Sequence, residues 1–399
     1  MKTANRCSLI PASPTLAVSS KARALKAAGV DVISFSAGEP DFRTPDVIVE
    51  AAKRALDEGV HYYTSVNGTV ALREAICSYL ERRWEVSYAP NEVIVSTGAK
   101  QALYNLFLCL LNPGDEVLLP APSWVSYPTQ VTIAEGKPVI VPTHAEHDFV
   151  PTLEALDAAT TARTRAIVLN IPTNPSGAVW SREALESLAG WLRAHPDIVV
   201  VSDSIYNELV YDGASATELL AIAPDLRDRY VLVNGFSKSF AMTGWRLGYA
   251  AGPAELIGAM AKRQSQSTSN ANSMAQAAAI VALDNAEAVI PPMLEAFEQR
   301  RDLMHELLTA IPDVRVAKPK GAFYMFPDLS AYIGRKAGDV VLEDDLALAS
   351  WLLDAARVAV VPGSPFGSPG FVRLSYSTDE ATIREGVGRI REALATLPA

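Results

Sequence analysis

The stretch Asn234–Tyr249 reads NGFSKSFAMTGWRLGY and joins two apolar runs typical of buried strands, YVLV before it and GYAAG at its end. Lys238 stands just after the first run. A lysine held at a desolvated strand end loses its proton more readily and can attack a carbonyl, although an isolated lysine is more often a surface residue. Arg246 lies among residues that we expect to be buried, where a guanidinium needs an anionic partner. Arg246 and Ser237 together predict a phosphate site. Lys238, which lies between them, is the predicted covalent anchor of a cofactor.

On both sides of this stretch, short β-branched runs alternate with longer helical patterns. Many of the runs are continuously apolar, as expected for a sheet covered on both faces. Helical patterns such as AKQALYNLFLCLL and REALESLAGWLRAH lie between several of them. The pattern predicts an α/β fold with a mainly parallel sheet and crossover helices. The strand candidates are EVIVSTG, DEVLLPAP, KPVIVPT, RAIVLN, IVVVSDS, YVLVNGFS and RLGYAAG.

The length of 399 residues suggests two domains, on a prior of roughly 150 residues each. After about residue 285, a long helical pattern leads to GAFYMFPDL, a helix near DDLALASWLLDAA and the strand FVRLSYS. We expect a large domain over 41–290, a smaller α+β domain over 291–399, and an N-terminal arm over 1–40 that joins the small domain in space.

The charge and composition exclude several classes of function. The formal net charge is −10 without a basic block, so we expect no binding to nucleic acid or to an anionic membrane. No apolar run reaches the roughly 20 residues of a membrane span, and the N-terminus lacks a signal-peptide core, so the cytoplasm is the expected location. The three cysteines are far apart, and His144 and His147 lack further ligands, so we expect no metal site.

In parallel sheets ligands bind beyond the carboxyl ends of the strands, so the polar residues at these ends are the candidate ligand contacts. Asp203 ends the run IVVVSD, where a buried carboxylate needs a cation or hydrogen-bond donors. A protonated pyridinium nitrogen would be such a partner, and Tyr206 could turn its hydroxyl toward the same ligand. A capping aspartate followed by a packing tyrosine is an equally good interpretation of this segment.

The turn STGAK joins the strand EVIV to a helix. Free amide groups at that helix start, from Ala99 onward, make an anion site, and Gly98 lets a phosphate approach the backbone. Lys100 opposes the macrodipole in the first helical turn, which suggests a nearby anion, although the lysine could simply reach solvent.

Three further residues each allow a functional and an ordinary interpretation. Arg373, in FVRLSYS, could bind a substrate carboxylate or form an internal salt bridge. Trp124, in PSWVSYP, could stack on an aromatic ring or pack in the core. Asn174, in NIPTNPSG, could present its amide to a ligand or serve only as a turn residue.

Taken together, the chain resembles the class I aminotransferases, which are fold-type I pyridoxal phosphate enzymes, and most closely the type Ib bacterial aspartate aminotransferases. The matching segments occur in family order over nearly the whole chain, and the ordered set is far more specific than any one segment. They are SFSAGEPDF, YTSVNGTVALREAI, STGAKQALYNLF, PSWVSYP, NIPTNPSGAV, VSDSIY, SKSFAMTGWRLGYAAGP, PKGAFY and VRLSYS.

The resemblance implies a role for each candidate residue around pyridoxal 5′-phosphate. Lys238 would form the internal aldimine and shuttle the proton, and Asp203 would keep the pyridine nitrogen protonated. Tyr206 and Asn174 would bond the phenolic oxygen, while Trp124 would stack on the ring. The remaining implied contacts are the phosphate with Gly98, Ala99, Lys100, Ser237, Arg246 and the neighbouring subunit's Tyr63, and the substrate with Gly38, Trp124, Asn174, Arg373, Thr15 and Lys100.

The resemblance further implies a homodimer with shared active sites and transfer of an amino group between an amino acid and a 2-oxo acid through pyridoxamine phosphate. Thr15 and Lys100 are associated in this branch with a distal substrate carboxylate, which favours aspartate, glutamate, oxaloacetate or prephenate. Of the two contacts implied for Lys100, we favour the one with the distal substrate carboxylate over the one with the cofactor phosphate. Aromatic or aliphatic substrates, and a lyase or cyclase on the same fold, stay open as alternatives. A pyridoxal phosphate-binding regulator is disfavoured. Such regulators carry an N-terminal DNA-binding domain, whereas only a short arm precedes SFSAGEPDF.

Two positions depart from the family pattern. Ser204 stands where the family usually has a glutamate, and Ser176 replaces the commoner threonine. Neither change removes a catalytic atom, but the first could mark a divergent subgroup.

Overall fold

Successive side chains of a strand point to opposite faces, so the run IVVVSD needs apolar cover on both sides. In the computed structural model of the chain, Val200 packs in one apolar core, whereas Val199 and Val201 pack in another on the opposite face of strand β6 (Val199–Asp203). The structure describes residues 2–3, 7–8, 10, 14–214 and 216–398, with the side chains of 14–17 left out.

The central sheet has seven strands in the order β2-β8-β7-β6-β5-β3-β4. All neighbours are parallel except β8, which runs antiparallel to β2 and β7. The predicted mainly parallel α/β sheet is thus confirmed. The strands are β2 (Val93–Ser96), β3 (Glu116–Pro120), β4 (Lys137–Val141), β5 (Thr164–Asn170), β6, β7 (Tyr230–Gly235) and β8 (Gly248–Ala251).

Helices cover both faces of this sheet, as the crossover pattern requires. One face is covered by α2 (Asp46–Asp57), α3 (Val70–Trp84), α6 (Leu153–Ala159), α7 (Arg182–Ala194), α8 (Leu219–Ile222) and α10 (Ser273–Asp284). The other is covered by α4 (Ala99–Leu110), α5 (Ser126–Ile133) and α9 (Ala254–Ser265).

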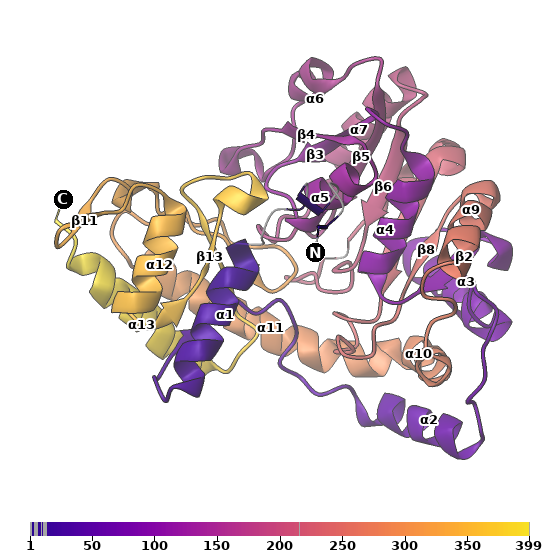
Figure 1. Cartoon of the computed structure of the whole chain (residues 1–399), viewed down its shortest axis with the longest axis horizontal. Coiled ribbons are helices and arrows are strands. Elements are labelled where there is room, and N and C mark those ends of the chain that lie inside the picture. Colours follow the sequence, from indigo (N-terminus) through magenta and orange to yellow (C-terminus); the bar gives the residue numbers. More distant parts are fainter. Residues whose placement is uncertain (1, 4–6, 9, 11–13, 215, 399) are drawn as a thin grey trace.

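A further apolar core forms away from the sheet, where the C-terminal helices gather beside α1 (Pro14–Ala27) (Figure 1). The N-terminal segment takes part, because β1 (Ile33–Ser34) pairs in parallel with β12 (Val358–Ala359). The other elements here are α11 (Ala286–Thr309), α12 (Asp345–Ala355), α13 (Glu380–Ala395), the hairpin β10 (Lys336–Ala337)–β11 (Val340–Val341) and the sheet of β13 (Val361–Pro362), β14 (Val372–Ser375) and β9 (Tyr324–Met325).

Helix α11 connects the two parts of the molecule (Figure 1). Ile290, near its start, packs in the core beside the sheet, whereas Phe297 and Met304 pack in the C-terminal core. The domain boundary expected at residue 290 therefore falls inside this helix, and the boundaries stay a prediction. No single described helix has the length and apolarity needed to cross a bilayer, although α10 and α11 pass that test as a pair bent by 80°.

Candidate active site

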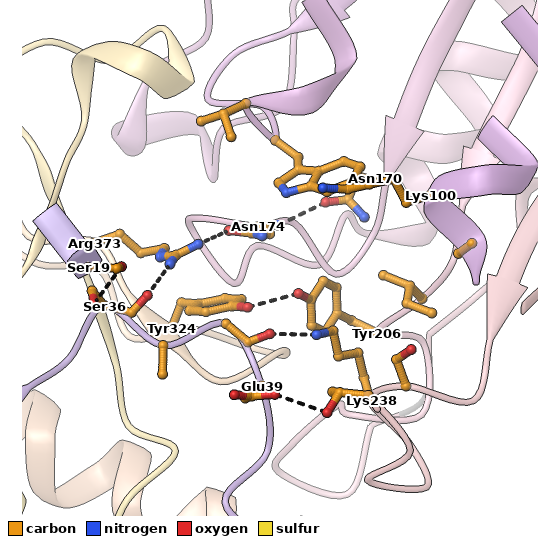
Figure 2. Close-up of a pocket in the computed structure, with 18 of the residues that line it drawn as sticks. Ser19, Ser36, Glu39, Lys100, Asn170, Asn174, Tyr206, Lys238, Tyr324 and Arg373 are labelled. Carbon is orange, nitrogen blue, oxygen red and sulfur yellow. Dashed lines mark hydrogen bonds between the residues drawn. The ribbon is translucent and has the colours of Figure 1, made fainter. Parts of the chain in front are cut away.

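A cavity of about 720 Å³ opens where strands β5, β6 and β7 end (Figure 2). Its size suits a small organic ligand. Asp203 is the last residue of β6, and Lys238 follows the end of β7 by three residues. The cavity also collects most of the other residues selected from the sequence: Gly38, Ala99, Lys100, Trp124, Asn174, Tyr206, Ser237, Arg246 and Arg373.

Asp203 is buried, with only 4% of its surface exposed. Its carboxylate accepts a hydrogen bond of 2.6 Å from the Tyr127 hydroxyl and one of 3.4 Å from the backbone of Ile205. Burial raises the pKa of Asp203 to about 6, while the Tyr127 hydrogen bond opposes the rise. No cation pairs with this carboxylate in the described part of the chain, and no helix begins after it, so the capping interpretation is wrong. A buried carboxylate in this state is suited to a cationic ligand.

Lys238 is half-buried and lines the same cavity. Its Nζ atom donates a hydrogen bond of 2.5 Å to the carbonyl of Gly38. The pKa of Lys238 is lowered to about 8, mainly by burial; the charges of Arg373 and Arg246 act in the same direction, whereas those of Glu39 and Asp203 oppose the change. Near neutral pH a useful fraction of the amine is therefore unprotonated and nucleophilic.

One end of the cavity is suited to an anion. Helix α4 begins at Ala99, directly after Gly98, whose φ of 86° belongs to the left-handed region. A Cβ atom at Gly98 would lie 2.7 Å from the Arg246 guanidinium, and one at Gly248 would lie 2.2 Å from the Ala99 nitrogen. The two glycines thus let the helix start, with its free amide groups, approach this guanidinium.

The Arg246 side chain is exposed, which differs from the buried environment expected from its neighbours. The reason is that it faces the open cavity, and its Nη1 atom donates a hydrogen bond of 2.8 Å to the Thr243 carbonyl. Ser237, which is buried, lines the same cavity. The guanidinium is therefore available to a ligand rather than to the protein core.

Lys100 and Trp124 line another part of the cavity. The Lys100 ammonium lies 4.7 Å from the centre of the Trp124 ring, within the range of a cation–π contact. Burial lowers the pKa of Lys100, and the nearby Arg246 charge adds to that effect. Trp124 also makes an edge-to-face contact with Tyr127, with ring centres 5.3 Å apart.

Arg373, on β14, is a buried cation without a carboxylate partner in the described part of the chain; 7% of its surface is exposed. It donates 3.0 Å hydrogen bonds to the side-chain oxygen of Asn174 and to the carbonyl of Ser36 (Figure 2). Its Nε atom is buried and has no hydrogen-bond partner among the residues that the structure describes. The internal salt bridge considered from the sequence is absent there, and the unpaired charge calls for an anionic ligand.

Tyr206 is buried, and its hydroxyl forms a 2.9 Å hydrogen bond with that of Tyr324, which lies beneath the Arg373 guanidinium at 4.5 Å from ring centre to Cζ. Burial raises the pKa of Tyr206 well above its ordinary value of 10.0, so its hydroxyl stays protonated.

Tyr63 and Thr15 are the two remaining residues that the sequence predicts for the site. Tyr63 is 90% exposed and lies outside the cavity. Thr15 falls in α1, in the part of that helix whose side chains are outside the described set.

The sequence interpretation missed several residues that complete the site: Ser36, Glu39, Tyr127, Asn170 and Tyr324. Asn170 accepts from the Asn174 backbone at 2.9 Å and donates to the Asp203 carbonyl at 2.9 Å, so it joins two strand ends. A signal existed for some of them. Tyr127 and Tyr324 lie in PSWVSYP and PKGAFY, which also carry the resemblance, and Asn170 is the last residue of its strand.

Ser204 points away from the cavity, because it follows Asp203 in an extended segment. It is buried, and its hydroxyl lies 3.1 Å from that of Ser202. The buried carboxylate of Glu218 lies in the same cluster, 3.4 Å from Ser202 and 3.1 Å from the Tyr230 hydroxyl. A carboxylate from another segment is thus present beside the position where the resemblance expects a glutamate.

The residues set aside from the sequence also lie away from the cavity. His144 and His147 are exposed, and the described residues contain no group of three or more metal-ligating side chains. All three cysteines are free. Cys7 is exposed, and Cys77 and Cys109 are half-buried.

The family described as aminotransferase class I and II matches residues 30–390. The aspartate/prephenate aminotransferase of Nitrosomonas europaea is 45% identical over 99% of this chain and 100% of its own length. The protein of that name from Cereibacter sphaeroides is 49% identical over 96% of both chains.

Solved structures give the same result. The aspartate aminotransferase from Rhizobium meliloti superposes with a TM-score of 0.97 at 42% identity, and both chains are covered completely. The Thermus thermophilus aspartate aminotransferase with maleate has a TM-score of 0.92 at 43% identity, covering 98% of this chain and 100% of that one.

Proposed function

The chain belongs to the class I and II aminotransferase family and is an aminotransferase, and on this premise we propose that it moves the amino group of aspartate or glutamate to a 2-oxo acid with pyridoxal 5′-phosphate as its cofactor. One observation carries the proposal. A single cavity contains a lysine amine with a lowered pKa, a buried carboxylate and a buried guanidinium, and among the described residues neither of the last two has an ion-pair partner.

The cavity fits this cofactor residue by residue. Asp203 would hold the protonated ring nitrogen, which would supply the cation that its buried carboxylate lacks. The phosphate would lie between the α4 start, Ser237 and Arg246, in the space that the glycines leave. Trp124 would cover the ring, and Tyr206 and Asn174 would lie at its phenolic oxygen. When bound, the cofactor supplies an aldehyde for covalent attachment and a ring that accepts electron density from the substrate.

Arg373 would bind the substrate α-carboxylate, because a planar guanidinium forms two parallel hydrogen bonds to a carboxylate. Its contacts with Asn174 and Ser36 hold it in place before substrate arrives. The Gly38 carbonyl accepts a hydrogen bond from Lys238, and Gly38 lines the same cavity as Arg373. Fixing the carboxylate there orients the bond between the α-carbon and its hydrogen toward the Nζ atom of Lys238, which would take and return that proton.

The preference for a dicarboxylate rests on Lys100 and Thr15. The Lys100 ammonium lies in the cavity without a carboxylate partner among the described residues, and it can pair with a distal carboxylate of the substrate. Relatives that are 45% and 49% identical carry the name aspartate/prephenate aminotransferase, which makes prephenate, also a dicarboxylate, a second candidate for the 2-oxo acid.

We further propose a cytoplasmic homodimer in which Tyr63 reaches the phosphate of the neighbouring subunit. Tyr62 and Tyr63 are 83% and 90% exposed in the single chain, and two adjacent exposed aromatic rings are typical of an interface. Light scattering of the purified protein measures the mass, and Tyr63→Phe should weaken cofactor binding without changing that mass.

The test of the proposed activity is a screen of single half-reactions. The cofactor-loaded protein is mixed with aspartate, glutamate, alanine, an aromatic or a branched-chain amino acid, and the cofactor spectrum is followed. An aminotransferase converts the cofactor to pyridoxamine phosphate, whereas a lyase returns it to the aldehyde form. We expect the fastest conversion with aspartate or glutamate, and a clear advantage for an aromatic or aliphatic donor would refute the dicarboxylate assignment.

A further inference from the structure

Helix α1 presents a polar face to the cavity. Ser19, Ala22, Arg23 and Lys26 all line it, and their spacing of three, four and seven residues places them on one side of a helix. Arg23 and Lys26 thus face the same space as Arg373, although they lie far from it in sequence.

The cavity is strongly cationic in an acidic protein. Among the described side chains that line it, six are basic, Lys238 included, and two are acidic, Glu39 and Asp203, whereas the whole chain has a formal net charge of −10. Four of the cations already have roles in the proposed function. Arg23 and Lys26 do not. Neither forms an ion pair in the described part of the chain, and Arg23 donates only to the Ser20 hydroxyl, at 3.3 Å.

Another cation of the same helix gives a contrast. Lys21 is paired with Asp354 at 2.8 Å and is not among the residues that line the cavity. Its charge is therefore neutralised on another side of α1. The helix keeps its unpaired charges on the cavity side.

Contacts hold this face of α1 close to the substrate end of the site (Figure 2). The hydroxyls of Ser19 and Ser36 lie 3.0 Å apart, and the Ser36 carbonyl accepts from Arg373. Ala22 is buried in an apolar cluster with Val32 and Leu353. Arg23 and Lys26 are therefore carried on a docked helix.

We propose that Arg23 and Lys26 form an electrostatic capture site that concentrates doubly charged 2-oxo acids at the Arg373 end of the cavity. The proposal rests on the proposed function and names residues that select its substrates by charge. Both side chains are exposed, so they act through the field that they add to the cavity rather than through a desolvated contact. Such a field acts on substrate capture, is screened by salt, and leaves the chemical step unchanged.

The test removes the two charges together in the cofactor-loaded enzyme, as Arg23→Gln with Lys26→Gln. At an ionic strength of about 10 mM, where screening is weak, we expect KM for oxaloacetate to rise about fivefold to tenfold with kcat unchanged. At about 0.5 M salt the difference should fall below about twofold. The effect should be smaller for pyruvate, which has one charge, and absent for alanine, which has no net charge.

Lys21→Gln is the matched control, because it removes one cation from the same helix but not from the cavity. An unchanged KM for oxaloacetate at low salt in the double variant would overturn the capture site. So would an equal change for alanine, a loss of kcat without a change in KM, or an effect of the same size in Lys21→Gln.

A binding measurement separates this proposal from the proposed function. Maleate, a dianion that is not transaminated, is titrated into wild-type and double-variant holoenzyme at low and high salt, with acetate as the singly charged probe. If dicarboxylates prove not to be substrates, the proposed function fails, while weaker maleate binding by the variant at low salt still supports capture. Equal maleate affinities at low salt refute capture whatever the substrate is.

Discussion

The hydroxyl of Tyr127 donates a 2.6 Å hydrogen bond to Oδ2 of Asp203, and both side chains are buried. Burial raises the pKa of Tyr127 well above its ordinary value of 10.0, so the hydroxyl is a donor throughout the working pH range. The contact stabilises the charged form of Asp203, and the other oxygen, Oδ1, accepts a long hydrogen bond of 3.4 Å from the Ile205 backbone and can also accept from a cationic ring nitrogen.

Tyr127→Phe should therefore weaken cofactor binding by about tenfold to 100-fold, since a hydrogen bond to a charged group contributes about 1.5–3 kcal/mol. Equilibrium titration of cofactor-free protein measures the change. Tyr88→Phe is the matched control, because the Tyr88 hydroxyl is buried and has no hydrogen-bond partner within the described part of the chain. Equal affinities of the two variants for the cofactor would show that the Tyr127 contact does not support Asp203.

Asp203→Asn should stabilise the cofactor-free protein while abolishing activity. Raising the pKa of Asp203 from 3.8 to about 6 penalises the charged form by about 3 kcal/mol. This penalty is absent below about pH 3.8, grows as the pH rises and is complete above about pH 6. The asparagine variant should therefore unfold in urea with a free energy about 2–3 kcal/mol higher at pH 8 than the wild type, and the two should converge in acid. A variant less stable than the wild type at pH 8 would contradict the unpaired state of this carboxylate.

Several parts of the site could be predicted because strand ends can be read from sequence. The apolar runs that precede Asp203 and Lys238 indicate parallel strands, whose carboxyl ends lie at one edge of the sheet. Both residues do line one cavity. The glycine turn before α4 could also be predicted from the sequence, and Gly98 has the positive φ that such a turn requires.

Other features depend on tertiary contacts that a linear pattern does not contain. Tyr127 meets Asp203 across 76 positions of sequence, and Arg373 meets Asn174 across 199. The exposure of Arg246 follows from the open cavity rather than from its apolar neighbours. The carboxylate of Glu218 beside Ser202 and Ser204 comes from a segment that the resemblance does not mark.

Arg373 and Lys100 should differ in their effects on substrate choice. Arg373→Ala should lower kcat/KM for every amino donor by about 100-fold or more, because each donor has an α-carboxylate. Lys100→Ala should lower it about tenfold or more for aspartate and glutamate and leave alanine unchanged. Lys53→Ala, which removes an exposed lysine paired with Glu50 at 2.6 Å, is the control. A uniform loss over all donors in Lys100→Ala would assign that lysine to the phosphate instead.

Restoring the glutamate that the family usually has at position 204 should destabilise this chain. Ser204→Glu would place a second carboxylate beside buried Glu218, whose pKa is already raised by burial. We expect a loss of about 3 kcal/mol in the free energy of unfolding, and partial recovery when Glu218→Gln is added. Urea unfolding of the single and double variants measures this coupling. Additive effects of the two changes would show that the side chains do not interact.

The central claim is that the Lys238 amine anchors the cofactor, and reductive trapping tests it most directly. Cofactor-loaded protein is treated with borohydride, digested, and analysed by mass spectrometry. We predict a pyridoxyl group on Lys238 alone and none in Lys238→Ala. Because burial lowers the pKa of this lysine to about 8, the rate of attachment to cofactor-free protein should rise with pH and level off above about pH 8. A label on another lysine, or an unchanged label in Lys238→Ala, would contradict the account.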